Sequence, residues 1–227
     1  MNSIKLDLHL HTTYSGDSLI KPKEALKFAK LKGLDGFAIT DHNSLKAYKI
    51  LIEENNQDLI IIPGMEIETD IGEVIALFLR EEIKTNDKNF FTIVDLIKEQ
   101  DGLVIIPHPF DFLRSNRLKM ELLTDKIINN YIDGIEIINS RITFKKSVKK
   151  AIRFNQKYNL FETGGSDAHS NNEIGKAYTE INGITERSFE GIKKCLLENK
   201  SRSLGSLSSP LVHLKTVAHK IVTGKYL

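Results

Sequence analysis

The chain has 227 residues, of which 41% are apolar and 27% are charged, with 14 glycines and 5 prolines. This composition fits one well-packed domain and excludes the disordered and fibrous classes. The 32 basic and 30 acidic side chains leave a net charge of +2. The chain therefore lacks the overall cationic excess of a protein that holds nucleic acid by general electrostatics, although a local basic groove remains open.

Short apolar runs alternate with amphipathic stretches. We expect strands at residues 4–10, 36–40, 59–67, 103–107, 134–138 and 161–164, and helices at 22–32, 44–55, 90–100, 143–158 and 186–198. Because these strands lack polar/apolar alternation, they are typical of parallel strands buried between layers of helices. Residues 67–79 are an exception, since Asp70-Ile71-Gly72 predicts the turn of a hairpin.

The domain is expected to cover residues 1–200. Residues 201–227 predict a Ser-rich linker that ends near Pro210, followed by a C-terminal helical tail.

The N-terminal sequence MNSIKLDLHL has charge inside its apolar stretch and no small-residue cleavage site, so we expect no signal peptide. The single cysteine, Cys195, excludes an intramolecular disulfide and suits a reducing compartment. No uncharged apolar run approaches the roughly 20 residues of a membrane-spanning helix. We expect a soluble, cytoplasmic protein without a membrane partner.

Histidines gather where the expected strands end. Five of the seven do so, namely His9, His11, His42, His108 and His169. In a parallel α/β barrel these strand ends form one rim, so residues that are distant in sequence meet there. The pattern predicts a single site.

Asp7, His9 and His11 occupy alternate positions. Alternate side chains of a strand share one face, so the two imidazoles point to the same place and can chelate one ion. A buried Asp7–His9 hydrogen bond without metal is the alternative. Thr40-Asp41-His42 and Ser166-Asp167-Ala168-His169 repeat the arrangement after two other strands, and this repetition favours a metal site.

Glu66 and Glu136 are carboxylates inside apolar strands. Burial of a lone carboxylate is costly unless it meets a cation or hydrogen-bond donors. An ion pair with Lys or Arg is the alternative for each. Imidazole and carboxylate ligands without thiolates suit Zn, Mn or Fe. His213 and His219 lie in the expected C-terminal helix and are expected to be surface or packing residues.

Six segments, in this order, carry a family resemblance: DLHLHTTYSGDS, AITDHNS, PGMEIET, VIIPHPFD, GIEIIN and GGSDAH. Together they resemble the PHP family, named after polymerase and histidinol phosphatase, over about residues 5–180. The resemblance implies a distorted seven-stranded (β/α)7 barrel, similar to a TIM barrel. It also implies two or three divalent ions (Zn, Mn or Fe) and the hydrolysis of phosphoesters.

The resemblance also implies roles for individual residues. One metal would be held by His9, His11, Glu66 and Asp167, a second by Glu66 and His108, and a third by Asp17, His42 and His169. Asp7 and Asp41 would orient these ligands and, with Glu66, take part in catalysis. The basic candidates for the substrate phosphate are Arg114, Arg117 and Arg141, because arginine suits bidentate phosphate contacts. A solvated surface position is the alternative for each arginine.

Glu73 is a departure from the family pattern. Many relatives have a second-metal histidine after the turn that follows Glu66, whereas this chain has Glu73. As a ligand, Glu73 would shift preference from Zn²⁺ toward Mn²⁺. The alternative is a hairpin-edge glutamate that faces water.

The predicted function is that of a stand-alone, metal-dependent phosphoric ester hydrolase. Its substrate would be a small phosphorylated molecule, either a phosphomonoester or a nucleotide, attacked by a metal-bridging hydroxide. An exonuclease acting on short oligonucleotides is one alternative. Hydrolysis of a C–N or carboxylic ester bond is another, and a catalytically silent metal-binding module is a third.

Overall fold

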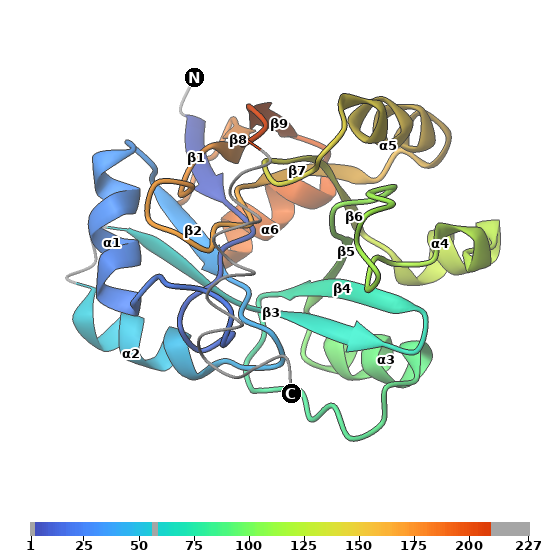
Figure 1. Ribbon diagram of the computed structural model, residues 1–227, viewed down its shortest axis with the longest axis horizontal. Coiled ribbons are helices and arrows are strands. Elements are labelled where there is room, and N and C mark those ends of the chain that lie inside the picture. The colour runs from blue at the N-terminus through green and yellow to red at the C-terminus, as the bar shows by residue number, and fades with distance from the viewer. Residues whose placement is uncertain (1–2, 56–58, 210–227) are drawn as a thin grey trace.

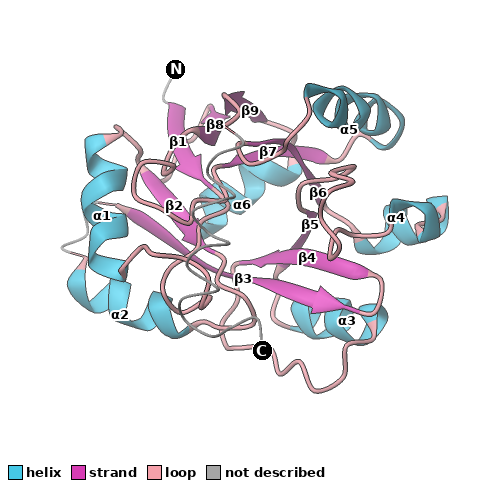
Figure 2. Cartoon of the chain, viewed as in Figure 1, coloured by secondary structure: helices cyan, strands magenta, loops and turns pink. Residues whose placement is uncertain are grey.

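The computed structural model describes residues 3–55 and 59–209. The strands of this part are β1 (Ser3–Asp7), β2 (Gly36–Ile39), β3 (Ile60–Thr69), β4 (Gly72–Leu77), β5 (Leu103–Ile106), β6 (Gly134–Asn139), β7 (Phe161–Gly165), β8 (Ala177–Asn182) and β9 (Ser201–Gly205). The helices are α1 (Pro22–Leu31), α2 (Lys46–Glu54), α3 (Phe90–Glu99), α4 (Asp125–Tyr131), α5 (Lys145–Tyr158) and α6 (Phe189–Leu197), with a 3-10 turn, η1, at Met120–Leu122. Figure 1 shows the helices around the strands, which are distinguished in Figure 2.

The strands form one mixed sheet in the order β7-β6-β5-β4-β3-β2-β1-β8-β9. β1, β2 and β3 are parallel to one another, as are β5, β6 and β7, whereas β4 is antiparallel to both β3 and β5. The predicted hairpin at residues 67–79 is confirmed by the β3–β4 pair, in which Thr69 lies opposite Gly72.

Backbone contacts beyond the ends of β1 and β7 nearly close the sheet into a barrel. The N–H of His11 donates to the carbonyl of Ala168 at 3.2 Å, and the N–H of Asp167 donates to the carbonyl of His9 at 2.7 Å. β1 therefore pairs with β8 along its length and contacts the segment after β7 beyond its end. The first and last motifs of the sequence pattern are thus held side by side.

The α/β class is confirmed, but the expected seven-stranded (β/α)7 barrel is wrong, because within the described residues the sheet has nine strands of mixed direction. The β3–β4 hairpin takes the place of a crossover helix, so β4 runs against its neighbours. The linker expected from residue 201 begins instead with β9, which pairs antiparallel with β8 through its backbone. The expected C-terminal helix, with His213 and His219, lies outside the described residues.

Three apolar clusters hold the barrel. The inner cluster joins alternate residues of most strands to α6, through residues such as Leu6, Ile62, Ile105 and Ile192. The two outer clusters pack α1 and α2 on one side and α3, α4 and α5 on the other. The polar strand ends are consequently the part of the barrel that is free for chemistry.

We predict that Ile192→Ala lowers the free energy of unfolding by about 2–5 kcal/mol, since it leaves a cavity where α6 packs on the inner cluster. Ile192 is fully buried, whereas Leu197 on the same helix is 54% exposed. The matched variant Leu197→Ala should change the free energy by no more than about 0.5 kcal/mol. Urea unfolding followed by circular dichroism measures both, and equal effects would contradict the packing assigned to α6.

Candidate active site

The strand ends bring the predicted ligands into one buried cluster. His9 and His11 follow β1, His42 follows β2, and Glu66 lies within β3. The remaining members come from β4 or follow β5 and β7, namely Glu73, His108, Asp167 and His169. All of them are buried except His42, which is partly exposed.

Glu66 lies at the centre of the cluster. Its Oε1 is 2.9 Å from Nε2 of His108 and 3.5 Å from Nε2 of His9. Its Oε2 is 3.2 Å from Nε2 of His11 and 3.3 Å from Nδ1 of His42. Despite burial, which raises it, the charge of His9 and hydrogen bonds from the imidazoles hold the pKa of Glu66 well below its ordinary value. One ionised carboxylate thus has both oxygens directed at four imidazoles, which come from the three segments that follow β1, β2 and β5.

His9 and His11 have defined tautomers. Nδ1 of His9 lies 3.1 Å from Oε1 of Glu136, and a carboxylate accepts, so this nitrogen donates. Nδ1 of His11 lies 2.8 Å from Oγ of Ser15, whose hydroxyl donates to Asp41, so this nitrogen also donates. In the neutral rings both Nε2 atoms then present lone pairs, although they are only 3.0 Å apart. A shared cation resolves this repulsion.

Space for the His9–Glu136 contact is provided by Gly165. A Cβ atom at this position would lie 2.3 Å from Cβ of His9 and 2.6 Å from Oε1 of Glu136. In the structure, Gly165 allows β7 to approach the ligand strand closely.

Asp167 faces the same centre. Its Oδ1 is 3.4 Å from Nε2 of His11 and 3.7 Å from Nε2 of His9, yet it has no hydrogen-bond partner within the described residues. The backbones of Asp167 and His108 have φ of 53° and 30°, values that non-glycine residues rarely adopt. Such strain is typical of functional positions that the surrounding structure holds in place.

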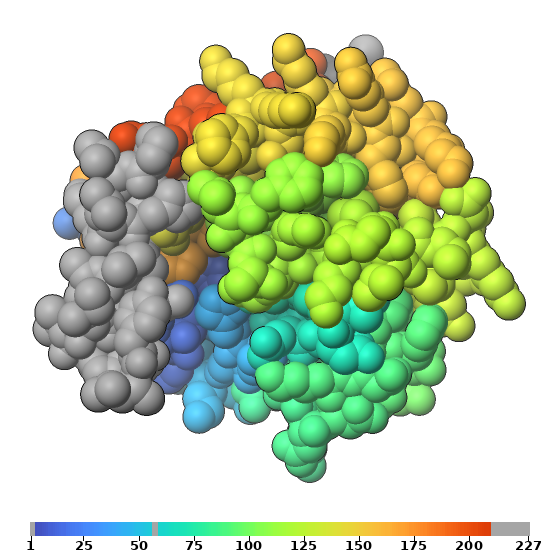
Figure 3. Space-filling view, turned by 45° about the vertical axis from the view of Figure 1, so that its right-hand side comes forward, coloured from blue at the N-terminus to red at the C-terminus, as the bar shows by residue number. Residues whose placement is uncertain are grey.

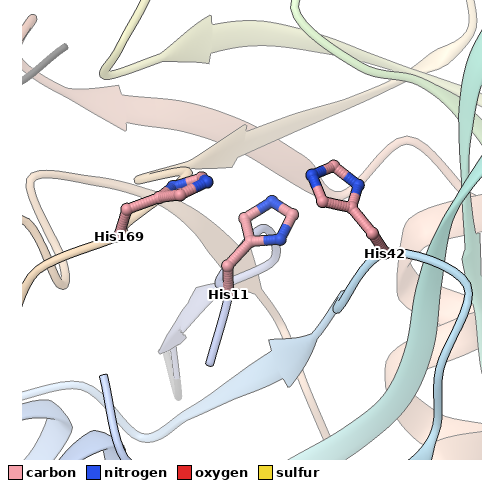
Figure 4. Close-up of side chains that lie close together, drawn as sticks. All are labelled: His11, His42 and His169. Atoms are coloured by element: carbon pink, nitrogen blue, oxygen red, sulfur yellow. The ribbon is translucent and has the colours of Figure 1, made fainter. Parts of the chain in front are cut away.

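His11 also faces His42 and His169, as Figure 4 shows. The ring centroids are 4.7 Å and 4.5 Å from that of His11. Asp17 Oδ2 lies 3.3 Å from Nε2 of His169 and 3.7 Å from Nε2 of His42. The predicted third group of ligands is therefore contiguous with the first.

The pKa shifts differ across the cluster. Although burial lowers it, hydrogen bonds and charges from Asp167 and Glu66 raise the pKa of His11 to about 10. Burial, reinforced by repulsion from Glu66, raises the pKa of Glu73 well above its ordinary value. Burial and the charge of Arg141 lower the pKa of His169 to about 4. The carboxylates thus favour protons on His11 and Glu73, where cations would also be favourable, whereas His169 lies on the side near Arg141 and is held neutral.

Glu73 does not face water, which was the alternative for this residue. Its side chain is 5% exposed, with Oε2 3.6 Å from Nε2 of His108 and Oε1 3.8 Å from Nδ1 of His42. Asn116 Nδ2 donates to the same Oε1, while Oε2 has no hydrogen-bond partner among the described residues. The hairpin therefore contributes two carboxylates, Glu66 and Glu73, to the cluster.

The two aspartates expected to orient ligands act differently. Asp41 accepts hydrogen bonds from Ser15 at 2.8 Å and from Thr12 Oγ1 at 2.6 Å, so it reaches His11 through Ser15. Asp7 accepts instead from the backbone N–H groups of Ser166 at 2.8 Å and Gly175 at 3.0 Å. Asp7 thus fixes the segment that carries Asp167, and burial raises the pKa of Asp7 to about 6.

Two of the three arginine candidates border the cluster. Arg114 donates to Asp167 and lies 3.4 Å from Asp111. Arg141 is 4% exposed, and its charge lowers the pKa of His169. Arg117 instead donates to the carbonyl of Leu118 and pairs with Glu121 at 3.6 Å, so the structure does not bring it to the ligands.

Asn139 is a functional candidate that the sequence did not indicate, and Glu136, noted as a buried carboxylate, was given no place in the predicted site. Glu136 accepts from the N–H of His108 at 2.7 Å and from Nδ2 of Asn139 at 2.9 Å, in addition to His9. Asn139 Nδ2 also lies 3.2 Å from Asp167 Oδ2. Both belong to the segment GIEIIN, so polar residues in an otherwise apolar strand were the available signal.

The residues fit divalent metal ions. Four groups of three have potential ligand atoms within 4.8 Å of one another: His9, His11, Asp167; His9, Glu66, His108; His42, Glu66, Glu73; and His11, His42, His169. The groups overlap through His9, His11, His42 and Glu66, as expected for adjacent ions that share ligands. The lone pairs of His9 and His11 and the unpartnered oxygens of Asp167 and Glu73 all face this space. Mixed nitrogen and oxygen donors without thiolates suit Zn, Mn or Fe.

Comparisons with known proteins agree with this arrangement. The family model described as PHP domain matches residues 7–162, and the model described as PHP-associated matches residues 146–200. The uncharacterized protein MJ0417 of Methanocaldococcus jannaschii is 36% identical over 179 residues, which cover 78% of this chain and 70% of that protein.

Two solved structures have a similar fold. One is a two-domain protein from Bacteroides vulgatus that contains a predicted PHP-like metal-dependent phosphoesterase, with a TM-score of 0.76, 21% identity and coverage of 90% of this chain and 65% of that one. The other is the lesion-specific endonuclease PfuEndoQ from Pyrococcus furiosus, with a TM-score of 0.68, 19% identity and coverage of 92% and 60%. This chain thus spans less than two thirds of either. Within its own described ranges, no helix is long and apolar enough to cross a membrane.

We predict that Glu136→Gln weakens metal binding roughly 10–100-fold. The carboxylate of Glu136 accepts from three donors, whereas the amide of Gln has one acceptor oxygen and would no longer hold the imidazole of His9 in place. Glu162→Gln on neighbouring β7 is the matched control and should bind like the parent. Competition with a chromogenic chelator measures both affinities. Equal affinities for the two variants would exclude an orienting role for Glu136.

Proposed function

The chain belongs to the PHP domain family, and we propose that it is a metal-dependent phosphoesterase with its active site around Glu66. One observation carries the proposal: the two oxygens of Glu66 lie 2.9–3.5 Å from nitrogen atoms of four histidines. A carboxylate so placed can bridge cations that are separately held by these imidazoles. Divalent ions bound there would lower the pKa of a bound water and supply hydroxide near neutral pH.

The side chains have distinct tasks in this proposal. His9, His11 and Asp167 hold the first ion, Glu66 with His108 and Glu73 the second, and Asp17, His42 and His169 the third. Ser15 and Glu136 accept from Nδ1 of His11 and His9, so Nε2 is the nitrogen of each ring that would release its proton and bind an ion. Because these hydrogen bonds hold the two rings in place, ion binding would release protons with little movement of the rings.

Arg114 and Arg141 are proposed to bind the substrate phosphate. Each guanidinium borders the cluster, one beside Asp167 and the other close enough to His169 to lower the pKa of that imidazole. Both carry the positive charge and parallel donors that a phosphate accepts. The substrate that we propose is a phosphate ester of a nucleotide or of another small phosphorylated molecule. A silent binding module is disfavoured, since every predicted ligand faces the cluster.

The test is metal-dependent hydrolysis. We expect protein stripped with chelator and reloaded with Mn²⁺ to bind at least two ions per chain and to hydrolyse bis(p-nitrophenyl) phosphate or a phosphomonoester. Glu66→Gln should fold normally and lose this activity, because a neutral amide cannot bridge two cations. A panel with esters and amides distinguishes the alternative bond types. Wild-type turnover by Glu66→Gln at saturating metal, or a stoichiometry of one ion or fewer, would refute the proposal.

Glu73 is expected to tune the metal preference. Glu73→Ala should lose metal affinity or turnover at least about tenfold, as expected for removal of a metal contact, and Glu73→His should regain part of it with Zn²⁺. Glu68→Ala is the matched control, since Glu68 lies opposite Glu73 in the hairpin but is exposed and pairs with Lys88. If Glu73→Ala behaves like Glu68→Ala with every metal, Glu73 is not a ligand.

A further inference from the structure

The first half of α5 has a cationic surface next to the active site. Five basic side chains occupy nine consecutive positions without an acidic residue among them: Lys145, Lys146, Lys149, Lys150 and Arg153. Lys145, Lys149 and Arg153 are spaced four apart and are exposed, so they form one stripe on the helix. We call these five residues, together with Phe112 and Phe144, the α5 surface.

The charge of the α5 surface is not neutralised by neighbours. Within residues 3–55 and 59–209, none of its five cations forms an ion pair, whereas Lys157 farther along the same helix pairs with Asp125 at 2.8 Å. Like charges four residues apart repel and destabilise a helix. Since the chain as a whole carries only +2, this surface is a local excess that a polyanion would complement.

The α5 surface begins at the rim of the cluster of candidate metal ligands. Arg141, beside His169, precedes α5 by four residues, and Oγ of Ser147 in the first turn donates to the carbonyl of Phe110 at 2.9 Å. That contact ties α5 to the loop that carries His108 and Arg114. Figure 3 shows the loop after β5, in light green, packed directly against α5, in yellow, on one face of the molecule. An anionic chain on this surface would therefore end near the proposed phosphate-binding arginines.

Two aromatic rings lie exposed among these cations. Phe112 is 57% exposed and Phe144 is 51% exposed. Two cations lie near the ring of Phe112, with Nζ of Lys150 4.3 Å and Cζ of Arg117 5.2 Å from its centroid. Exposed rings next to cations bind single strands, because unpaired bases stack on the rings while the phosphates contact the charges.

We propose that the α5 surface binds single-stranded nucleic acid and directs one of its phosphodiester bonds toward the metal cluster. This inference rests on the proposed function for the reaction, but the binding step is independent of it. It selects nucleotide phosphoesters over other phosphorylated molecules as the substrate class. It also suggests a role for Arg117, which does not contact the metal ligands: near the ring of Phe112, its guanidinium could contact a phosphate of the bound nucleic acid.

Binding is tested with metal-loaded protein and a fluorescent phosphorothioate oligothymidylate of about 12 nucleotides, which resists hydrolysis. In fluorescence anisotropy, the double variant Lys145→Glu/Lys149→Glu should lose roughly tenfold or more in affinity, and its salt slope should fall by about 1.4 if both lysines contact phosphates. Lys27→Glu/Lys49→Glu makes the same charge change on α1 and α2, away from α5 (Figure 1). This control should bind like the parent.

Stacking is tested with Phe112→Ala, which should lose roughly fivefold or more in affinity for the single strand. Its control is Phe91→Ala, also an exposed phenylalanine (42%) but on α3. Equal losses in both lysine variants, or no single-strand binding by the parent, would overturn the inference. Tighter binding of a duplex than of its single strands would overturn it as well. Hydrolysis of bis(p-nitrophenyl) phosphate by the parent reports on the proposed function separately, so that either proposal can fail alone.

Discussion

Burial of negative charge at the mouth of the barrel is the constraint on which this structure depends. Glu66, Glu73 and Asp167 are each no more than 4% exposed. Carboxylates buried in this way need cations or hydrogen-bond donors. Arg114 compensates Asp167 only in part, because Oδ1 of that residue keeps no hydrogen-bond partner among the described residues. Protonated imidazoles compensate the remaining negative charge. Bound metal ions would compensate the same charge in place of these protons.

The fold tolerates these buried carboxylates because they are confined to one end of the barrel. The inner apolar cluster, closed by α6, supplies the burial that stabilises the fold, while the strand ends carry the charged groups. The hairpin is the local departure that matters, since antiparallel β4 returns Glu73 to the neighbourhood of Glu66. A regular crossover helix after β3 would have carried the next polar residue away from the cluster.

Much of this was accessible from the sequence. Apolar runs that end in His or Asp predicted the strands and their common rim, because parallel strand ends coincide in space. α4 was missed, since its seven residues are too few to show a helical period, although Thr124 caps it by accepting from Ile127. β9 was missed because Ser201–Gly205 has none of the β-branched or aromatic residues that are typical of strands.

The candidate site was predictable in membership more than in connectivity. Histidines and carboxylates could be named from the chain, but tautomers depend on partners such as Ser15, which is adjacent to His11 and Asp41 only after folding. The placement of Asp7 illustrates the same limit. Alternation in a strand suggested that it supports the imidazole of His9, whereas its carboxylate accepts from the backbone N–H groups of His9, Ser166 and Gly175.

Gly165 shows that an inventory of ligands does not define this site. Since a Cβ at this position would collide with both His9 and Glu136, a single added methyl group would force apart a contact on which the orientation of the first imidazole depends. A descendant of this chain could retain every histidine and carboxylate and still be inert. In such a relative, an alanine in place of Gly165, which contacts neither metal nor substrate, would account for the loss of activity.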